Sequence, residues 1–139
     1  MAAERATFSG ITADILLGGS QAPLTVMSML VAPRQGAPAH ISFDEDKVFV
    51  IEKGKLLFMV DELRLLVKAG EQVFVPRGAV HGFTCATEEH ARVILVSSPS
   101  RHDAFFKAMG QLPTPHTPEA VQAVCERFRQ AIVGPVIEL

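Results

Sequence analysis

The segment 38–47, PAHISFDEDK, carries side chains that could bind a metal ion or act as acid and base. It contains one histidine, one serine, three consecutive carboxylates and a lysine, and it leads into the apolar run VFVI. Imidazole and carboxylate groups are common ligands of iron and zinc, and histidine is also a common general acid or base. Three adjacent carboxylates are equally typical of a solvated acidic loop. The types of residue therefore leave a metal site and an acidic loop as two interpretations.

A second segment, GEQVFVPRGAVHGFTC at 70–85, places a histidine directly after a series of turn residues. Gly70 permits a tight turn between strands, and Pro76 and Gly78 bend the next connection. His81 then falls at the start of a strand, and we expect its side chain to face the interior of the fold. The spacing of these four residues is more specific than a single glycine-rich loop.

Together the two segments resemble the two sequence motifs of the cupin superfamily. Gly70, Pro76, Gly78 and His81 match the second motif, G-x5-P-x-G-x2-H. The first motif reads G-x5-H-x-H, three or four residues, E-x6-G. In the family, its two histidines and glutamate bind a metal together with the histidine of the second motif.

Alignment of the closing glycine of the first motif on Gly54 places the family's ligands on this chain. The resemblance then puts the first histidine on His40, the second on Ser42 and the glutamate on Lys47. It implies that His40 and His81 keep metal-ligand positions, whereas serine and lysine replace two ligands. A lysine with its ordinary pKa of about 10.4 is a cation at neutral pH and has no lone pair for a metal.

A register shifted by one residue would instead let Asp46 complete a metal site with His40 and His81. Two imidazoles, one carboxylate and water would suit iron(II) or zinc. The cofactor is therefore unknown from the sequence. We expect none, and the alternative is a divalent metal such as iron, zinc, nickel or manganese.

The walls of a ligand pocket would be mostly apolar, because Trp and Tyr are absent and nine Phe supply all aromatic side chains. We expect four residues to contact a ligand: Ser42, Phe49, Phe83 and Cys85. Cys85 shares the inward face of His81 but lies about 13 Å further along the strand, too far to bind the same ion. His90, His102 and His116 match no motif and receive no role.

Short apolar runs separated by Gly, Pro and charged residues predict many strands between residues 7 and 98. The expected strands are 11–17, 24–32, 47–52, 55–60, 63–68, 72–75, 80–85 and 92–97. Residues 63–68 alternate, which predicts one solvent-facing side. The runs VFVI and LLFMV are apolar on both faces, so we expect a second subunit or the chain's own tail to cover the outer face.

The C-terminal part has helical periodicity. Ser100 and Asp103 resemble a capping box, and an apolar stripe of His102, Phe105, Phe106 and Met109 precedes a natural stop at Gly110. A second helix begins with Thr117 as N-cap and Pro118 at the first position. Its expected apolar stripe is Val121, Val124, Cys125, Phe128 and Ile132, and Gly134 and Pro135 end it.

The fold class that the resemblance implies is all-β: a double-stranded β-helix, or jelly-roll cupin barrel, with two short C-terminal α-helices. We expect residues 1–139 to form a single cupin domain, with the barrel at about 7–98 and the helical tail at about 100–133. The tail is also similar to single-domain cupins of the quercetin-dioxygenase-like group. The family is often dimeric, and the doubly apolar strands favour a homodimer.

The composition restricts the partners. A net charge of −2, a pI near 6.2 and the lack of a basic cluster argue against nucleic acid. No apolar stretch approaches the roughly 18 to 20 residues that span a bilayer, and no secretion signal is apparent, so we expect a cytoplasmic protein without a membrane partner. The two cysteines are expected to be reduced.

Three functions follow from these residues. The first is a metal-independent barrel that binds a small acidic or carbonyl-bearing molecule, in which Lys47, His81 and His40 could be catalytic as electrophile, Schiff-base lysine or general base. The second is a metal-dependent quercetinase-like dioxygenase that uses His40, His81 and a carboxylate from Glu45 or Asp46. The third is a non-catalytic ligand sensor or dimerisation module. Whether the protein is an enzyme is uncertain; an oxygenase, isomerase, cyclase or decarboxylase would fit.

Overall fold

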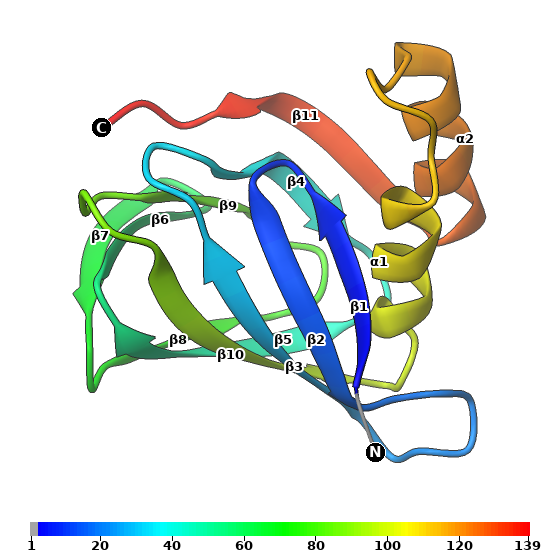
Figure 1. The fold of residues 1–139 in the computed structure, drawn as a ribbon, viewed down its shortest axis with the longest axis horizontal. Coiled ribbons are helices and arrows are strands. Elements are labelled where there is room, and N and C mark those ends of the chain that lie inside the picture. Colours follow the sequence, from blue (N-terminus) through cyan, green and yellow to red (C-terminus); the bar gives the residue numbers. More distant parts are fainter. Residues whose placement is uncertain (1–2) are drawn as a thin grey trace.

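The computed structural model describes residues 3–139, which form a barrel of two antiparallel sheets with two helices at one end (Figure 1). This confirms the predicted all-β double-stranded β-helix with two short helices. The strands are β1 (Glu4–Phe8), β2 (Ile11–Leu17), β3 (Thr25–Val31), β4 (Gly36–Ser42), β5 (Asp46–Lys53), β6 (Lys55–Val60), β7 (Leu63–Lys68), β8 (Gln72–Val75), β9 (Val80–Cys85), β10 (Ala91–Ser98) and β11 (Gln130–Val136). The helices are α1 (His102–Gly110) and α2 (Pro118–Arg127).

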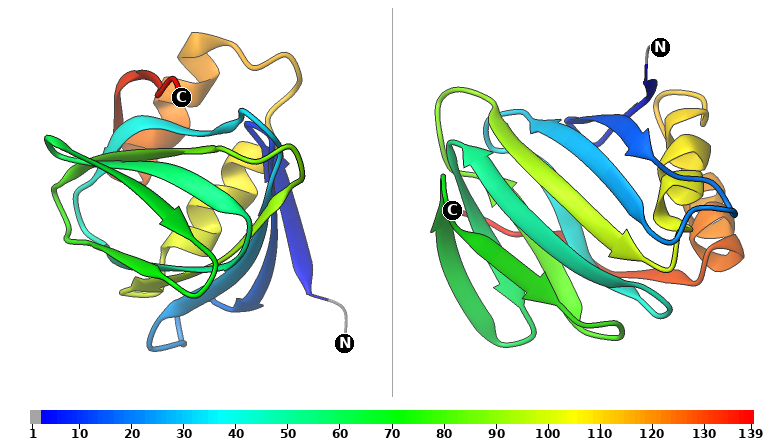
Figure 2. Two further views of the ribbon diagram at one scale, coloured as in Figure 1. Left: turned by 90° about the vertical axis from the view of Figure 1, so that its left-hand side faces the viewer. Right: turned by 90° about the horizontal axis from the view of Figure 1, so that it is seen from below.

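The two sheets face each other and enclose the core (Figure 2). One sheet has the strand order β1-β2-β3-β10-β5-β8, and the other has the order β11-β4-β9-β6-β7. All pairings are antiparallel, so alternate residues of each strand point into the barrel. The motif strands β4 and β9 are neighbours, and β5 lies in the opposite sheet. Residues from both sheets therefore meet inside the barrel.

The alternation of strand β5 points Lys47 into the barrel. Lys47, Phe49 and Ile51 are buried inside the barrel, whereas Val48 and Val50 face outward and Val50 is 38% exposed. Helix α1 packs mainly on β1 and α2 on β11, so the tail does not explain the apolar outer face of β5. The homodimer stays a prediction.

The strands predicted from the apolar runs are present with small shifts at their ends, but three further strands were not predicted. These are β1, β4 and β11. Strand β4 has the sequence GAPAHIS, whose glycine, proline and alanines carry little strand propensity. The expected alternation of 63–68 is only partly present: Val67 is buried, but Leu63 and Leu65 are exposed because β7 is the edge of its sheet.

The start of α1 differs from the expected capping box. Arg101 is the N-cap residue and provides no side-chain cap. The Ser100 hydroxyl instead donates to the carbonyl oxygen of Gly19, and the Asp103 carboxylate accepts from the Gly19 N–H. These two residues therefore fix α1 to the loop after β2. The helix ends at Gly110 as predicted.

Helix α2 begins as expected and ends early. The Thr117 side chain accepts a hydrogen bond from the N–H of Ala120, which confirms the N-cap. The helix ends at Arg127, and the chain continues as β11 beside β4, so the prediction of a helical stripe through Ile132 and a helical tail to about 133 was wrong. Residues after Arg127 form a strand because they pair with the edge of β4, and the periodicity of the local sequence cannot reveal this pairing. Among residues 3–139, neither helix has the length and apolar character needed to cross a bilayer.

Candidate functional site

The most unusual feature of the interior is a lysine between two histidines, here called the lysine–histidine cluster (His40, Lys47 and His81). His40 and His81 are opposite each other in the register of β4 and β9, and their ring centroids are 4.1 Å apart. Lys47 reaches toward them from β5 and is only 2% exposed. Its Nζ lies 3.0 Å from His81 Nε2 and 3.5 Å from His40 Nε2.

Backbone carbonyl groups determine the tautomer of both histidines. His40 Nδ1 lies 2.7 Å from the carbonyl oxygen of Pro38, and His81 Nδ1 lies 3.0 Å from that of Ala79. A carbonyl oxygen can only accept a hydrogen bond, so each Nδ1 carries the proton. The Nε2 atom of each neutral ring then presents its lone pair to Lys47. The lysine nitrogen is therefore the donor in both contacts.

Burial favours the neutral forms of all three side chains. It lowers the pKa of Lys47 from 10.5 to about 7, and the charge of Glu45 only partly opposes this. Burial and the nearby Lys47 charge lower the pKa of His40 to about 3, and they also lower the pKa of His81 far below its ordinary value. At neutral pH both imidazoles are uncharged, and a large share of Lys47 is a free amine.

Lys47 and His40 line a cavity of about 290 Å³ inside the barrel. Its other walls are largely apolar. They include the predicted pocket residues Phe49 and Phe83, together with Ile11, Met29 and Leu95. Phe49 and Phe83 pack edge to face with ring centroids 5.6 Å apart. The cavity has the form common to small-molecule sites, namely an apolar chamber with a few polar groups.

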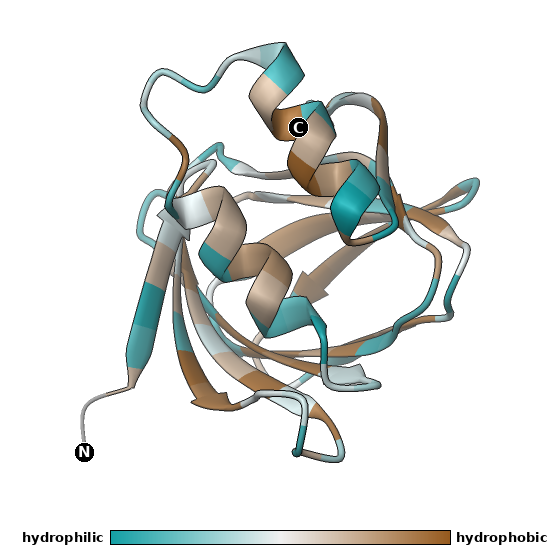
Figure 3. Ribbon diagram, turned by 90° about the vertical axis from the view of Figure 1, so that its right-hand side faces the viewer, coloured by the Kyte–Doolittle hydropathy of each residue, from teal (hydrophilic) through white to brown (hydrophobic). Residues whose placement is uncertain are grey.

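The tail forms one wall of this cavity. Figure 3 shows α1 and α2 lying across one end of the barrel. His102, Phe105, Phe106 and Met109 of α1 line the cavity, so the apolar stripe predicted for this helix faces the chamber. Sequence reasoning gave His102 no role because it matches no motif. Its position within that stripe was the signal that could have located it.

Two buried polar atoms beside the cluster have no partner among the described residues. One is Nδ1 of His102, whose ring packs against Phe105 and Phe106. The other is Oγ of Ser97, which is paired with Lys47 in the register of β10 and β5 and shares its inward face. Buried polar atoms without a partner are uncommon and are often satisfied by a ligand or a water molecule.

Two residues predicted to contact a ligand are not on the cavity wall. Cys85 is buried near Thr87 at the far end of β9, where its Sγ lies 3.4 Å from Thr87 Oγ1. Ser42 points inward, but its hydroxyl donates to Gln130 of β11. Gln130, which the sequence did not single out, lines the cavity.

Asp46 does not take the position that a shifted register would require. Because Lys47 faces inward, its neighbour on β5 faces outward. The Asp46 carboxylate pairs with Arg77, with an Oδ2–Nη2 distance of 3.0 Å, and this pairing lowers its pKa. The interpretation of Asp46 as a ligand beside the two histidines is therefore wrong in this structure.

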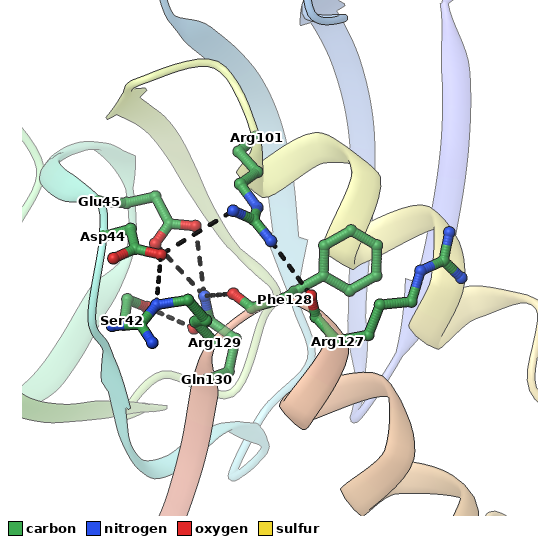
Figure 4. Close-up of polar contacts among 8 residues, drawn as sticks. All are labelled: Ser42, Asp44, Glu45, Arg101, Arg127, Phe128, Arg129 and Gln130. Atoms are coloured by element: carbon green, nitrogen blue, oxygen red, sulfur yellow. Dashed lines mark hydrogen bonds and ion pairs between the residues drawn. The ribbon is translucent and has the colours of Figure 1, made fainter.

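A second buried polar group, here called the glutamate–glutamine cluster (Ser42, Glu45 and Gln130), joins the tail to the barrel (Figure 4). Gln130 Nε2 lies 3.3 and 3.4 Å from the two carboxylate oxygens of Glu45 and also donates to the carbonyl of Phe128. Near the surface, Arg129 pairs with Asp44 at 2.8 Å. Every polar side-chain atom of this cluster has a partner, and burial raises the pKa of Glu45.

Comparison with known families identifies the barrel. The family model described as Cupin domain matches residues 27–97, which is just over half of the chain. The chain belongs to this cupin family. The matched part contains His40, Lys47 and His81, whereas the tail residues His102 and Gln130 lie outside it. No curated protein sequence matches the chain.

Solved structures agree on the cupin fold at low sequence identity. An RmlC-like cupin from Shewanella frigidimarina has a TM-score of 0.65 and 21% identity, covering 73% of this chain and 88% of that one. KdgF from Halomonas sp. has a TM-score of 0.65 and 18% identity, covering 73% and 90%. A sugar phosphate isomerase of the cupin superfamily from Silicibacter pomeroyi has a TM-score of 0.62 and 20% identity, covering 71% of each chain.

The residues in the cupin metal position do not fit a divalent cation. The Nε2 lone pairs of His40 and His81 converge as ligands would, but the amine of Lys47 lies where a shared ion would be. Two imidazoles alone are fewer protein ligands than the usual three. Among residues 3–139, no group of three or more His, Cys, Asp or Glu side chains is arranged to hold a metal ion.

Proposed function

We propose that this cupin barrel binds a small organic molecule with a carbonyl or carboxylate group in its central cavity, and that Lys47 replaces the metal ion as the polar anchor. The observation that carries the proposal is the position of Lys47 Nζ, buried on the cavity wall and 3.0 Å from His81 Nε2. Burying an ionisable lysine costs free energy, so a role in binding would explain why it is there.

The surroundings of Lys47 support a ligand with an apolar body and a polar end. The phenylalanine, methionine and leucine walls would contact the body, and Lys47 and His40 would contact the oxygen atoms. The unpartnered His102 Nδ1 would accept or donate a further hydrogen bond. Polar atoms inside an apolar chamber fix the orientation of a ligand more than they add to its affinity.

The names of similar structures are consistent with small-molecule chemistry in such barrels. One is a sugar phosphate isomerase, and another is a predicted oxalate decarboxylase from Thermotoga maritima with 18% identity and a TM-score of 0.61. At this identity they support the barrel as a site for small molecules, and they do not select a substrate.

Mass spectrometry of small molecules released from the purified protein, with elemental analysis of the same sample, tests the proposal. We expect an organic acid or carbonyl compound and less than one tenth of a metal ion per chain. A thermal-shift screen with aldehydes and carboxylic acids would then find a stabilising compound class. The shift should disappear in Lys47→Met, which keeps an unbranched side chain as far as Cε and removes the amine.

Lys53→Met is the matched control, because Lys53 is on the same strand and its side chain is 65% exposed. This variant should keep the shift. A stoichiometric metal that is lost in His81→Ala would overturn the proposal and favour the metal-dependent oxygenase. Equal binding by wild type and Lys47→Met would also overturn it.

A further inference from the structure

The two histidines orient the amine of Lys47. A neutral amine has two N–H bonds and one lone pair in a roughly tetrahedral arrangement. Both Nε2 atoms accept hydrogen bonds, at 3.0 Å from His81 and 3.5 Å from His40. When both N–H bonds point to these acceptors, the lone pair points away from the imidazoles. Since Lys47 lines the cavity, the free side of its nitrogen faces the chamber.

The amine also lacks a carboxylate partner that would hold it in the charged form. Among residues 3–139, no ion pair involves Lys47. Asp46, its neighbour in the sequence, pairs with Arg77. The charge of Glu45 does act on Lys47, but its carboxylate is bound by Gln130. The pKa of Lys47, lowered to about 7 by burial, is consistent with a free amine at neutral pH. An unprotonated lysine in an apolar pocket is a nucleophile for carbonyl carbon.

We propose that Lys47 forms an imine with a small, mostly apolar aldehyde or ketone held in the central cavity. This inference rests on the proposed function and narrows its ligand from a carbonyl or carboxylate compound to a reactive carbonyl. The nitrogen lone pair adds to the carbonyl carbon, and the carbonyl oxygen takes up a proton. The resulting carbinolamine loses water to give a C=N bond. The two amine protons leave with the oxygen as that water, so atoms and charge balance without any co-reactant.

The histidines and the tail supply the remaining parts of this reaction. Nε2 of His81 and of His40 accept from Lys47 and are placed to take a proton from the attacking nitrogen, and His40, which lines the cavity, would return a proton to the departing oxygen. His102 Nδ1, unpartnered on the wall formed by α1, would bind a second polar atom of the ligand. The carbonyl compound is therefore expected to carry a hydroxyl or carboxylate at a distance from its reactive carbon.

A route for the ligand lies between α2 and β11. A surface groove there shares four residues with the inner cavity: His116, Cys125, Gln130 and Ile132. The chamber and the groove are therefore adjacent, and a molecule could enter without disturbing the barrel strands. His116, which the sequence left without a role, lies at this junction.

Reductive trapping tests the imine. The full chain is incubated with 4-hydroxybenzaldehyde or hexanal, reduced with sodium borohydride, and analysed by intact-protein and peptide mass spectrometry. We expect one adduct per chain, with the mass of the aldehyde minus one oxygen atom, located on Lys47. Labelling of Lys47 should exceed that of exposed Lys53 at least tenfold. Lys47→Met should lose the adduct, whereas Lys53→Met should keep it.

The corresponding acids, 4-hydroxybenzoate and hexanoate, can bind but cannot form an imine, so they distinguish ligand binding in the cavity from imine formation on Lys47. If the aldehydes or acids stabilise the protein but borohydride fixes no adduct on Lys47, the imine is overturned and the binding function stands. If neither aldehydes nor acids stabilise or label the protein, both fail. Equal labelling of Lys47 and Lys53 in the wild-type peptide map would also overturn the imine, and this readout does not depend on the folding of a variant.

Discussion

The two buried polar clusters differ in how their hydrogen bonds are satisfied, although Glu45 and Lys47 are only two residues apart. In the glutamate–glutamine cluster, an amide links a hydroxyl and a carboxylate, and no polar atom lacks a partner. In the lysine–histidine cluster, an amine contacts two neutral imidazoles and no carboxylate, and two atoms nearby, His102 Nδ1 and Ser97 Oγ, have no partner.

This difference indicates a division of roles. A fully paired buried network holds elements together, and here it fixes β11 and the tail to the β4–β5 connection. A buried ionisable lysine without a carboxylate partner destabilises the fold, and a site of this kind is retained for binding or chemistry more often than for stability. We therefore infer that the glutamate–glutamine cluster is structural and that the lysine–histidine cluster is the functional site.

The largest expected effect is a pH dependence of the free energy of unfolding, caused by Lys47. A lysine with a folded pKa near 7 and an unfolded pKa near 10.5 binds fewer protons in the folded state between these values, so stability rises with pH across this window. From pH 7 to pH 9 the wild type should gain about 2 kcal/mol relative to Lys47→Met. Urea unfolding of both proteins at pH 7, 8 and 9 measures this difference.

The comparison with Lys47→Met isolates the lysine. The other titratable groups around it, His40, His81, His102 and Glu45, are present in both proteins. At pH 7 the variant should be at least as stable as the wild type, because methionine buries the same chain without a charge. Parallel pH profiles of the two proteins would contradict a lowered lysine pKa.

The sequence was most informative where local pattern and motif coincide. The spacing of the second motif placed His81 and Phe83 inside the barrel, and alignment of the first motif put Lys47 at a ligand position; all three side chains are buried in the structure. Alignment of the first motif also singled out His40, which lies on the cavity wall. These positions depend on strand parity and turn residues, which neighbouring sequence largely determines.

The tail's contribution to the site could not be predicted. Gln130 reaches Glu45 only because β11 pairs with β4. This pairing brings Gln130 next to Ser42, which is 88 positions away in the sequence. His102 faces the cavity because α1 crosses the end of the barrel. Both positions depend on long-range packing. The apolar stripe of α1 marks His102 as an inward-facing residue, but it does not show that the helix covers the cavity. Asp46 and Cys85 were misplaced because a motif alone does not show which side chains have other partners.

A smaller change in stability is expected from a substitution in the glutamate–glutamine cluster. Ser42→Ala removes the hydroxyl that donates to Gln130 and should cost about 1 kcal/mol of unfolding free energy. Because Ser42 is not on the cavity wall, the variant should keep wild-type stabilisation by a bound aldehyde. Loss of ligand binding with unchanged stability would reverse the roles assigned to the two clusters.

A substitution on the outer face of the sheet that contains β5 should have the smallest effect on the two buried clusters. Phe74 on β8 is 58% exposed next to outward-facing Val48, and a homodimer would cover both. Phe74→Ser should shift the mass in light scattering from dimer toward monomer at micromolar concentration and leave aldehyde trapping unchanged. A monomeric wild type under the same conditions would show the dimer prediction to be wrong.

An NMR titration of Lys47, in protein labelled with carbon-13 and nitrogen-15 lysine, tests most directly whether this side chain is a neutral amine at neutral pH. Its signal is identified by its loss in Lys47→Met. We predict a midpoint near pH 7, as expected for an amine buried between two neutral imidazoles. A midpoint near the ordinary value of about 10.4 would show that Lys47 is protonated at neutral pH. Lys47 would then be a charged, solvated side chain, and it could not serve as the nucleophile of the cavity.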